Sequence, residues 1–78
     1  MPNFRVDRND SKTSTPCGMS SLLYLGDNRR DAQQVFDCAQ PGFNHWNQPD
    51  KRYGVTLARW KGQSLTGDYV VEQHKGLA

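Results

Sequence analysis

The sequence predicts a small α+β domain in which one helix packs on one face of a four-stranded, mainly antiparallel sheet. The hydrophobic period is helical in residues 31–39 and changes to alternating in the segment 53–60, with which residues 68–73 can pair as a second strand. A chain of 78 residues is long enough for one domain with a small core. The expected order is strand, strand, helix, strand, strand, and two hairpins separated by a helix can pair as one sheet that carries the helix on one face.

Four segments have the alternation or composition of strands, namely residues 3–7, 21–26, 53–60 and 68–73. The first strand presents Phe4 and Val6 on one side, and we expect it at or near an edge of the sheet. In the third strand, side chains alternate between the faces, so Thr56, Ala58 and Trp60 are expected on the face that the helix leaves open to solvent.

Residues 29–40 are expected to form the helix. Its apolar face has the spacing i, i+3, i+4 and i+7, and consists of Ala32, Val35, Phe36 and Ala39. Asp27 or Asn28 can accept a hydrogen bond from an amide of the first turn. Pro41 cannot continue the helix, so the helix is expected to end just before it.

The loops are long and polar, and nothing divides residues 1–78 into two domains. Residues 8–19 are rich in Asn, Asp, Ser, Thr, Pro and Gly, and residues 61–67 are bounded by glycines, so both are expected to be flexible loops. Residues 43–52 embed aromatics in turn formers and are expected to fold back, with Trp46 covering one end of the core.

Composition excludes several classes of protein. The ten Lys and Arg and the eight Asp and Glu are scattered, giving a net charge of +2, which argues against both a strongly basic nucleic-acid binder and an acidic DNA mimic. The chain has no apolar run long enough to cross a bilayer and no signal-peptide pattern, so we expect a soluble protein of the cytoplasm. Cys17 and Cys38 are expected as free thiols in a reducing compartment, with a disulfide as the alternative.

No catalytic, metal or cofactor signature stands out. The side chains that could bind zinc lack the paired spacing of zinc sites: Cys17, Cys38, His45 and His74. A nucleophilic pair of Cys38 or Cys17 with His45 would need a third group to orient the base and a pocket that excludes water, for which so small a core has little room. Asp27 and Asp31 fit helix capping and the helix dipole. We therefore expect a protein that is not an enzyme, with no catalytic residue, no metal and no cofactor.

Basic and aromatic residues meet around the third strand. Arg59, Trp60 and Lys61 stand at its end, Arg52 precedes it, and Trp46 lies in the loop before it. Such residues are enriched in protein–protein hot spots, and they also bind single-stranded nucleic acid through phosphate contacts and stacking. A packed Trp beside solvated charges is the plainest interpretation. Because positive and negative residues are nearly balanced in number along the chain, we expect these five residues to contact a protein partner.

A short chain with no cofactor motif, much loop and a sheet covered on one face resembles the small proteins of bacteriophages and mobile elements, best known among them the anti-CRISPR proteins. The resemblance is one of size and architecture, without a shared motif. It implies a phage-encoded inhibitor that occupies a surface of a host defence complex, such as a CRISPR effector, and sterically blocks it in the bacterial cytoplasm. The alternatives are a small nucleic-acid-binding or regulatory domain that uses the open sheet face, and a small subunit or assembly factor of a larger complex.

Overall fold

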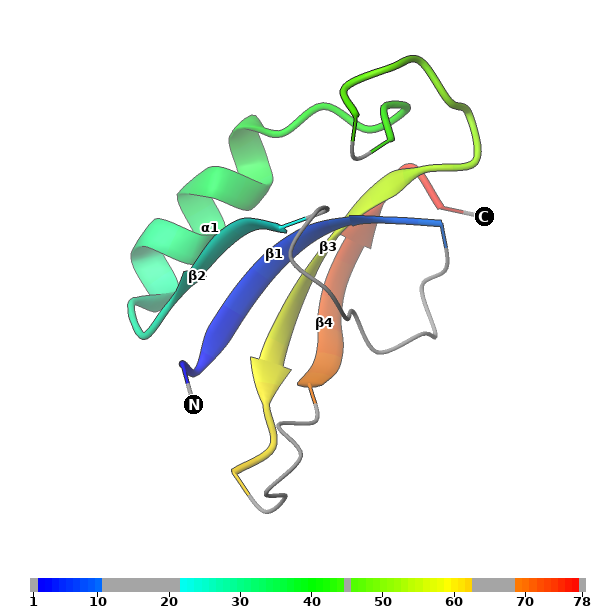
Figure 1. The fold of residues 1–78 in the computed structure, drawn as a ribbon. Coiled ribbons are helices and arrows are strands. Elements are labelled where there is room, and N and C mark those ends of the chain that lie inside the picture. Colours follow the sequence, from blue (N-terminus) through cyan, green and yellow to red (C-terminus); the bar gives the residue numbers. More distant parts are fainter. Residues whose placement is uncertain (1, 11–21, 45, 63–68, 78) are drawn as a thin grey trace.

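The described residues of the chain form four strands and one helix in the predicted order (Figure 1). The computed structural model describes residues 2–10, 22–44, 46–62 and 69–77. The elements are β1 (Phe4–Asn9), β2 (Leu22–Gly26), α1 (Arg29–Cys38), β3 (Gly54–Trp60) and β4 (Tyr69–Lys75). The strands form one sheet in the order β2-β1-β3-β4, and every neighbouring pair is antiparallel. The predicted α+β class is therefore confirmed.

Strand β1 is internal, because it pairs with β2 on one side and with β3 on the other. It is also longer than predicted. Arg8 and Asn9 are opposite Val55 and Gly54, so the ladder with β3 holds two residues that we had assigned to a flexible loop. Asp10 is exposed just after the strand, and residues 11–19 of that predicted loop lie outside the described residues.

Helix α1 begins with a side-chain cap and ends two residues earlier than predicted. Asn28 is the N-cap, and its Oδ1 accepts hydrogen bonds from the backbone N–H groups of Arg30 and Asp31. This satisfies two of the amides that a helix start leaves unpaired. At the other end Ala39 is extended, with ψ at 136°. Pro41, two residues further on, has no backbone N–H with which to continue the helix.

Strand β4 extends beyond its predicted end. His74 and Lys75 pair with Thr56 and Val55, so β4 runs alongside almost the whole of β3. A shift in register between Leu57 and Ala58 interrupts the ladder. The connection between β3 and β4 was predicted as a flexible loop, and residues 63–67 of it lie outside the described residues.

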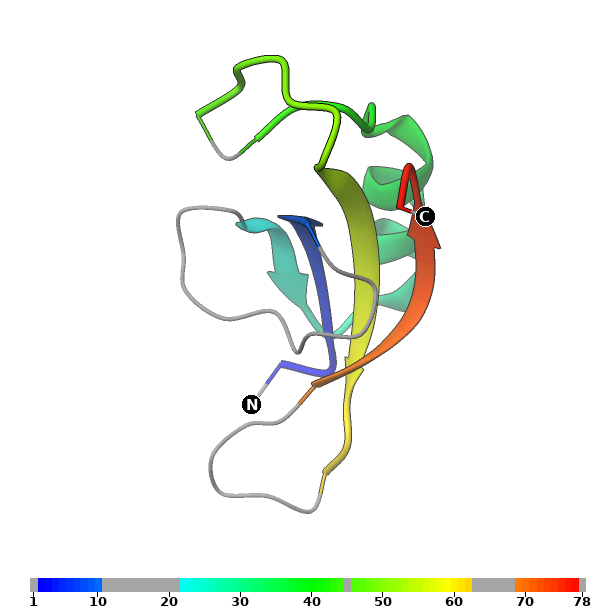
Figure 2. The ribbon, with the colours of Figure 1, turned by 90° about the vertical axis from the view of Figure 1, so that its right-hand side faces the viewer.

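The core lies between α1 and one face of the sheet. Its buried members are Phe4, Val6, Ala32, Phe36, Val55 and Leu57, and the partly buried residues packed against them are Leu23, Tyr24, Val35 and Ala39. All four residues of the predicted helix stripe belong to these two sets, so the amphipathic face is confirmed. Figure 2 shows α1 lying along one side of the sheet.

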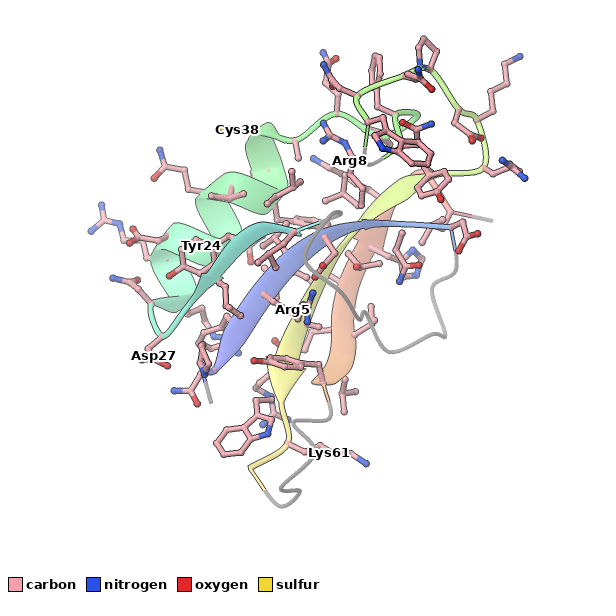
Figure 3. All side chains as sticks on the ribbon, viewed as in Figure 1. Arg5, Arg8, Tyr24, Asp27, Cys38 and Lys61 are labelled. Atoms are coloured by element: carbon pink, nitrogen blue, oxygen red, sulfur yellow. The ribbon has the colours of Figure 1, made fainter. Side chains whose placement is uncertain are left out.

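The expectation that the second face of the sheet stays open to solvent is wrong at its centre. Thr56 and Ala58 are fully buried, and so is Asp7 of the neighbouring strand β1. Arg5 and Tyr69 are also buried there. Two hydrogen bonds of 2.7 Å join the Arg5 guanidinium to the Asp7 carboxylate, and this guanidinium lies 5.4 Å from the centroid of the Tyr69 ring (Figure 3).

This bidentate pair explains how the charged side chains of Arg5 and Asp7 can be buried on this face of the sheet. Burying a lone charge is costly, but a carboxylate that is matched by both arms of a guanidinium loses much of that cost. Tyr69 adds a ring beside Arg5 and donates its hydroxyl to the carbonyl of Pro2 at 2.7 Å. Burial raises the pKa of Tyr69, so the hydroxyl stays protonated and continues to donate at neutral pH.

Candidate functional site

Trp46 is the most exposed large apolar side chain among the described residues, with 70% of its surface accessible. It belongs to the connection between α1 and β3, which passes over the end of the sheet where β3 begins (Figures 1 and 2). The expectation that Trp46 covers one end of the core is therefore wrong. Most of its surface is in contact with solvent. We call residues 42–44 and 46–53 the Trp46 loop.

Asn44 determines the conformation at the tip of the Trp46 loop. Its side-chain Oδ1 accepts hydrogen bonds from the backbone N–H groups of Trp46 at 2.9 Å and of Gln48 at 3.1 Å. Its backbone N–H donates to the carbonyl of Gln48 at 2.9 Å, and its carbonyl accepts from Asn47 at 2.9 Å. Asn47 is in the left-handed region at φ 60°, which asparagine tolerates better than most residues. The tip is thus closed by a side chain that takes the place of a backbone acceptor.

The base of the Trp46 loop is closed by backbone hydrogen bonds. The N–H of Gly42 donates to the carbonyl of Tyr53, and the N–H of Asp50 donates to the carbonyl of Gly42, both at 2.8 Å. Tyr53 donates to the carbonyl of Asp50 at 3.1 Å. Gly42 has φ at 89°, a conformation open to glycine at no steric cost. The loop therefore folds back as predicted, and it does so as a braced unit.

Arg52 is held at the base of the same loop by Asp50. Its Nε and Nη2 approach the two carboxylate oxygens at 3.1 and 3.0 Å, and its backbone N–H donates to Oδ1 at 3.0 Å. The side-chain hydrogen bond from Arg52 lowers the pKa of Asp50, and the same bond raises the pKa of Arg52. Arg52 and Lys51 are exposed, so this end of the molecule offers two cations near Trp46 along the chain.

The five predicted partner-binding residues do not form one surface. Trp46 and Arg52 lie beyond the start of β3, whereas Arg59, Trp60 and Lys61 lie at its end. A strand of this length separates its two ends by about 20 Å. Figure 3 places Lys61 at the opposite end of the sheet from the Trp46 loop. The structure therefore divides the candidates into two groups.

Within the second group, Arg59 and Trp60 point to opposite faces of the sheet. Arg59 is opposite Phe4, on the helix side, and its Nε donates to Glu72 at 3.1 Å. Trp60 is opposite Tyr69 on the second face and is half-buried. Its indole Nε1 is buried and has no hydrogen-bond partner among the described residues. The three neighbours in sequence therefore do not act as one basic and aromatic cluster.

Two functional candidates were missed by sequence reasoning, namely Arg29 and Glu72. Arg29 of α1 lies 3.2 Å from the same Glu72 carboxylate that Arg59 contacts. The available signal was a pair of basic residues, Arg29 and Arg30, in the first turn of the helix. Cations are unfavourable at the positive end of the helix dipole, so their presence there needs a reason outside the helix.

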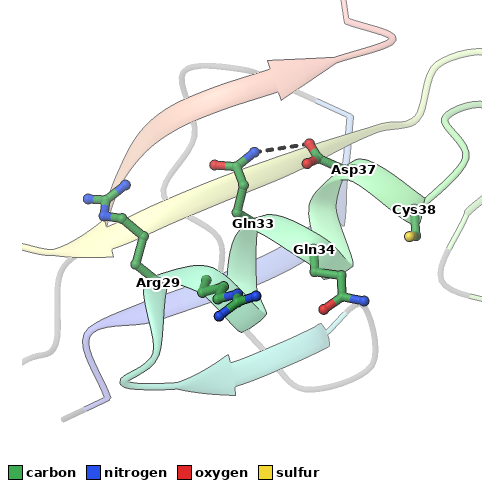
Figure 4. Close-up of a pocket in the computed structure, with 6 residues that line it drawn as sticks. Arg29, Gln33, Gln34, Asp37 and Cys38 are labelled. Carbon is green, nitrogen blue, oxygen red and sulfur yellow. Dashed lines mark hydrogen bonds between the residues drawn. The ribbon is translucent and has the colours of Figure 1, made fainter.

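A shallow groove of about 800 Å³ runs along the outer side of α1 (Figure 4). It is lined by Arg29, Arg30, Gln33, Gln34, Asp37 and Cys38. Gln33 donates to Asp37 at 3.0 Å and forms a reciprocal amide pair with Gln73 of β4 at 2.9 and 2.8 Å. All six lining residues belong to α1, and Cys38 is exposed at one end of the groove.

The described residues hold no group of three or more His, Cys, Asp or Glu side chains close enough to bind a metal ion. Cys17 and His45, which entered the zinc and nucleophile hypotheses, lie outside the described residues. In the described part of the chain, no helix is both long and apolar enough to span a membrane. Comparison with protein families, curated proteins and solved structures finds no match to this chain.

Proposed function

We propose that the chain is a protein-binding module that docks through the Trp46 loop. The observation that carries the proposal is the 70% exposure of Trp46 on a backbone fixed by hydrogen bonds at its tip and base. Tryptophan is costly to leave in water, and an exposed one on a braced loop is typical of an anchor that enters a pocket of a partner. In this proposal the chain acts by occupying a surface, and no residue has a catalytic role.

The braced loop supports tight binding because little conformational freedom remains to be lost. Ordering a flexible loop on binding opposes association, whereas Asn44 already closes the tip in the free protein. Lys51 and Arg52 are exposed on the same loop. The partner that fits this end has an apolar pocket for Trp46 with acidic groups near its rim.

A nucleic-acid partner is less consistent with the arrangement of the described residues. Stacking proteins use aromatic side chains that are accessible on a sheet face or groove. Here Thr56 and Ala58, at the centre of the second face, are fully buried, and Asp7 neutralises the buried Arg5. Among the described residues, the exposed cations are divided between the two ends of β3, so they do not form one continuous basic track.

We propose further that the bound protein is part of a host defence complex, such as a CRISPR effector, and that the chain is a phage-encoded inhibitor acting in the bacterial cytoplasm. The support is the resemblance in size and in architecture, a single helix on a small antiparallel sheet. In this narrower proposal the Trp46 loop occupies a surface that the complex needs for binding or cutting DNA.

The experiment for the broader proposal is affinity capture from a nuclease-treated bacterial lysate with the wild type and Trp46→Ala side by side. We expect a protein that the wild type retains and Trp46→Ala loses, at both low and moderate salt. Leu25→Ala is the matched control, because Leu25 is also an exposed large apolar residue but lies on β2. Retention of the same proteins by both variants, or capture of nucleic acid alone without nuclease, would contradict the proposal.

The narrower proposal is tested by DNA interference in bacterial cells that carry an active CRISPR effector. We expect the wild-type chain to restore transformation by a targeted plasmid and Trp46→Ala to leave interference intact. If the wild type has no effect while the capture experiment still yields a Trp46-dependent partner, the protein-binding function stands and the defence complex is the wrong target.

A further inference from the structure

Two arginines from different elements converge on one carboxylate at the end of the sheet where α1 begins. The Nη2 of Arg29, in the first turn of α1, lies 3.2 Å from Oε1 of Glu72, and the Nε of Arg59, in β3, lies 3.1 Å from Oε2. Figure 4 shows Arg29 extending from α1 toward β4. We call Arg29 and Arg59 the arginine fork.

The fork is oriented before any partner arrives. The guanidinium of Arg29 lies 4.7 Å from the centroid of the Phe4 ring, at cation–π distance. Phe4 is also directly opposite Arg59 in the ladder between β1 and β3. The buried Phe4 ring therefore lies beneath the guanidinium of Arg29 and beside Arg59. Glu72, which contacts both guanidinium groups, sets the distance between them.

The fork has binding capacity that Glu72 does not use. Its two side chains are 52% and 51% exposed, against 27% for Glu72. Glu72 engages one nitrogen of each guanidinium, and the remaining N–H groups of Arg29 and Arg59 have no hydrogen-bond partner within the described ranges. Two positive charges share one negative charge, so the fork together with Glu72 has a net charge of about +1, because guanidinium stays protonated in proteins.

Helix stability does not explain the fork. A cation in the first turn opposes the helix dipole, and two consecutive arginines stand there. The helix terminus is not itself the site, because the side chain of Asn28 occupies the amides of Arg30 and Asp31. A local feature that lowers stability and presents unused donors is typical of a binding position.

The neighbouring side chain indicates what kind of anion the fork accepts. Val70 of β4 is opposite Arg59 and is 39% exposed, so an apolar surface adjoins the charges. Glu72 shows that a carboxylate fits between the two guanidinium groups. Among the described residues, the exposed cations Arg30 and Lys61 lie at the same end of β3 as the fork, and Lys51 and Arg52 lie at the opposite end, so no continuous basic track along which a nucleic-acid backbone could run joins the two ends.

We propose that the arginine fork is a second docking point, which binds an acidic side chain next to an apolar one in a partner protein. The incoming carboxylate competes with Glu72 for the two guanidinium groups, so Glu72 is an internal competitor that limits the affinity. The proposal rests on the proposed function for its choice of a protein partner, but the fork lies at the opposite end of β3 from the Trp46 loop and is tested separately from it.

The probe is a six-residue peptide of alternating Glu and Leu, titrated into the full chain while the arginine Nε–H signals are followed by NMR. We expect Arg29→Gln and Arg59→Gln each to weaken binding of this peptide about two- to fivefold. Glu72→Gln is expected to strengthen it by a similar factor, because the internal competitor is removed. Arg30→Gln is the matched control: it removes the same charge from the same turn, from a side chain that forms no hydrogen bond or ion pair with Glu72, and is expected to leave the affinity within about twofold.

The opposite effects of the two kinds of variant separate the fork from a merely structural salt bridge. If Glu72→Gln weakens binding or leaves it unchanged, or if Arg30→Gln matches Arg29→Gln, the fork is not the site. Equal binding of the peptide with Gln in place of Glu, or tighter binding of oligothymidylate at the same salt, would also overturn the proposal. Trp46→Ala is expected to leave peptide binding unchanged, so failure of the fork and failure of the Trp46 loop are distinguishable. Thermal melts accompany each variant, and Glu72→Gln still decides the outcome if an arginine variant does not fold.

Discussion

Asn44 shapes the loop on which the proposed function depends. One carboxamide oxygen accepts two backbone N–H groups, those of Trp46 and Gln48, and so fixes the residue that we propose enters the partner. An alanine side chain at this position has no acceptor, so the two backbone N–H groups would have to form hydrogen bonds with water instead. The position of Trp46 is therefore determined by a small polar residue two positions earlier.

We predict that Asn44→Ala loosens the tip of the Trp46 loop without unfolding the sheet. Each lost hydrogen bond removes about 1 kcal/mol of local stability, so the amides of Trp46 and Gln48 should each exchange with solvent about fivefold faster. Hydrogen exchange followed by NMR measures this. Unchanged exchange at both amides would show that Asn44 does not brace the loop.

Asp50 gives the base of the loop a pH dependence. The pKa of Asp50 is lowered in the folded protein, chiefly by the side-chain hydrogen bond from Arg52, so the ionised form is favoured by folding. The pair therefore contributes its stability above the ordinary pKa of Asp, about 3.9, and loses it as the pH falls through the lower, folded value. The loop should be fully braced at neutral pH.

The corresponding prediction concerns the titration midpoint of the Asp50 carboxyl. NMR of that carboxyl should give a midpoint below the ordinary Asp value in the wild type and a midpoint closer to it in Arg52→Gln, since the main cause of the shift is removed. Lys51→Gln removes one charge next to Arg52 and is the matched control, with a smaller expected change. Equal midpoints in the wild type and Arg52→Gln would contradict the assigned cause.

Single residues were the hardest features to predict from the sequence. The sequence indicated that residues 43–52 fold back, but aromatics in loops commonly pack, so the exposure of Trp46 required the structure. Arg5 and Asp7 alternate with apolar neighbours and so look like a solvent face. Their burial depends on a bidentate pair between positions two apart, which alternation alone does not reveal.

At the scale of elements, α1 joins the sheet through a short apolar stripe. Phe36 is its largest buried residue and packs in the cluster that contains Val6 and Leu57. This much was predictable, because the periods of helix and strand follow directly from the spacing of apolar residues. The pairing of Arg29 with Glu72 was not, since the two are 43 positions apart and local patterns carry no information on such contacts.

We predict that Phe36→Ala lowers the free energy of unfolding by about 3–5 kcal/mol, since it leaves a cavity between helix and sheet. Gln34→Ala, on the exposed side of the same helix, should change it by less than about 0.5 kcal/mol. Urea denaturation followed by circular dichroism measures both. A loss below about 1 kcal/mol for Phe36→Ala would mean that α1 is not held by this core.

At the scale of the whole molecule, the sheet separates two proposed contacts. The Trp46 loop lies beyond the start of β3 and the arginine fork lies near its end, about 20 Å away across one continuous strand. A partner that contacts both the Trp46 loop and the arginine fork binds two sites held apart by one sheet, with no flexible linker between them. Once the first contact has formed, the rigid sheet keeps the second site close to the partner, which raises the overall affinity. The sequence predicted residues of both groups and gave them one partner, although Arg52 precedes the predicted strand and Arg59 stands at its end.

The most direct test of the account is the affinity of the purified, identified partner for the wild type and for Trp46→Ala, measured by calorimetric titration. The account predicts that Trp46→Ala weakens binding by at least about 2 kcal/mol, a factor of roughly 30, while the melting temperature stays within about 2 °C of the wild type. Leu25→Ala should bind within about threefold of the wild type. If Trp46→Ala binds as tightly as the wild type, the exposed tryptophan is not the anchor and the proposed docking surface is wrong.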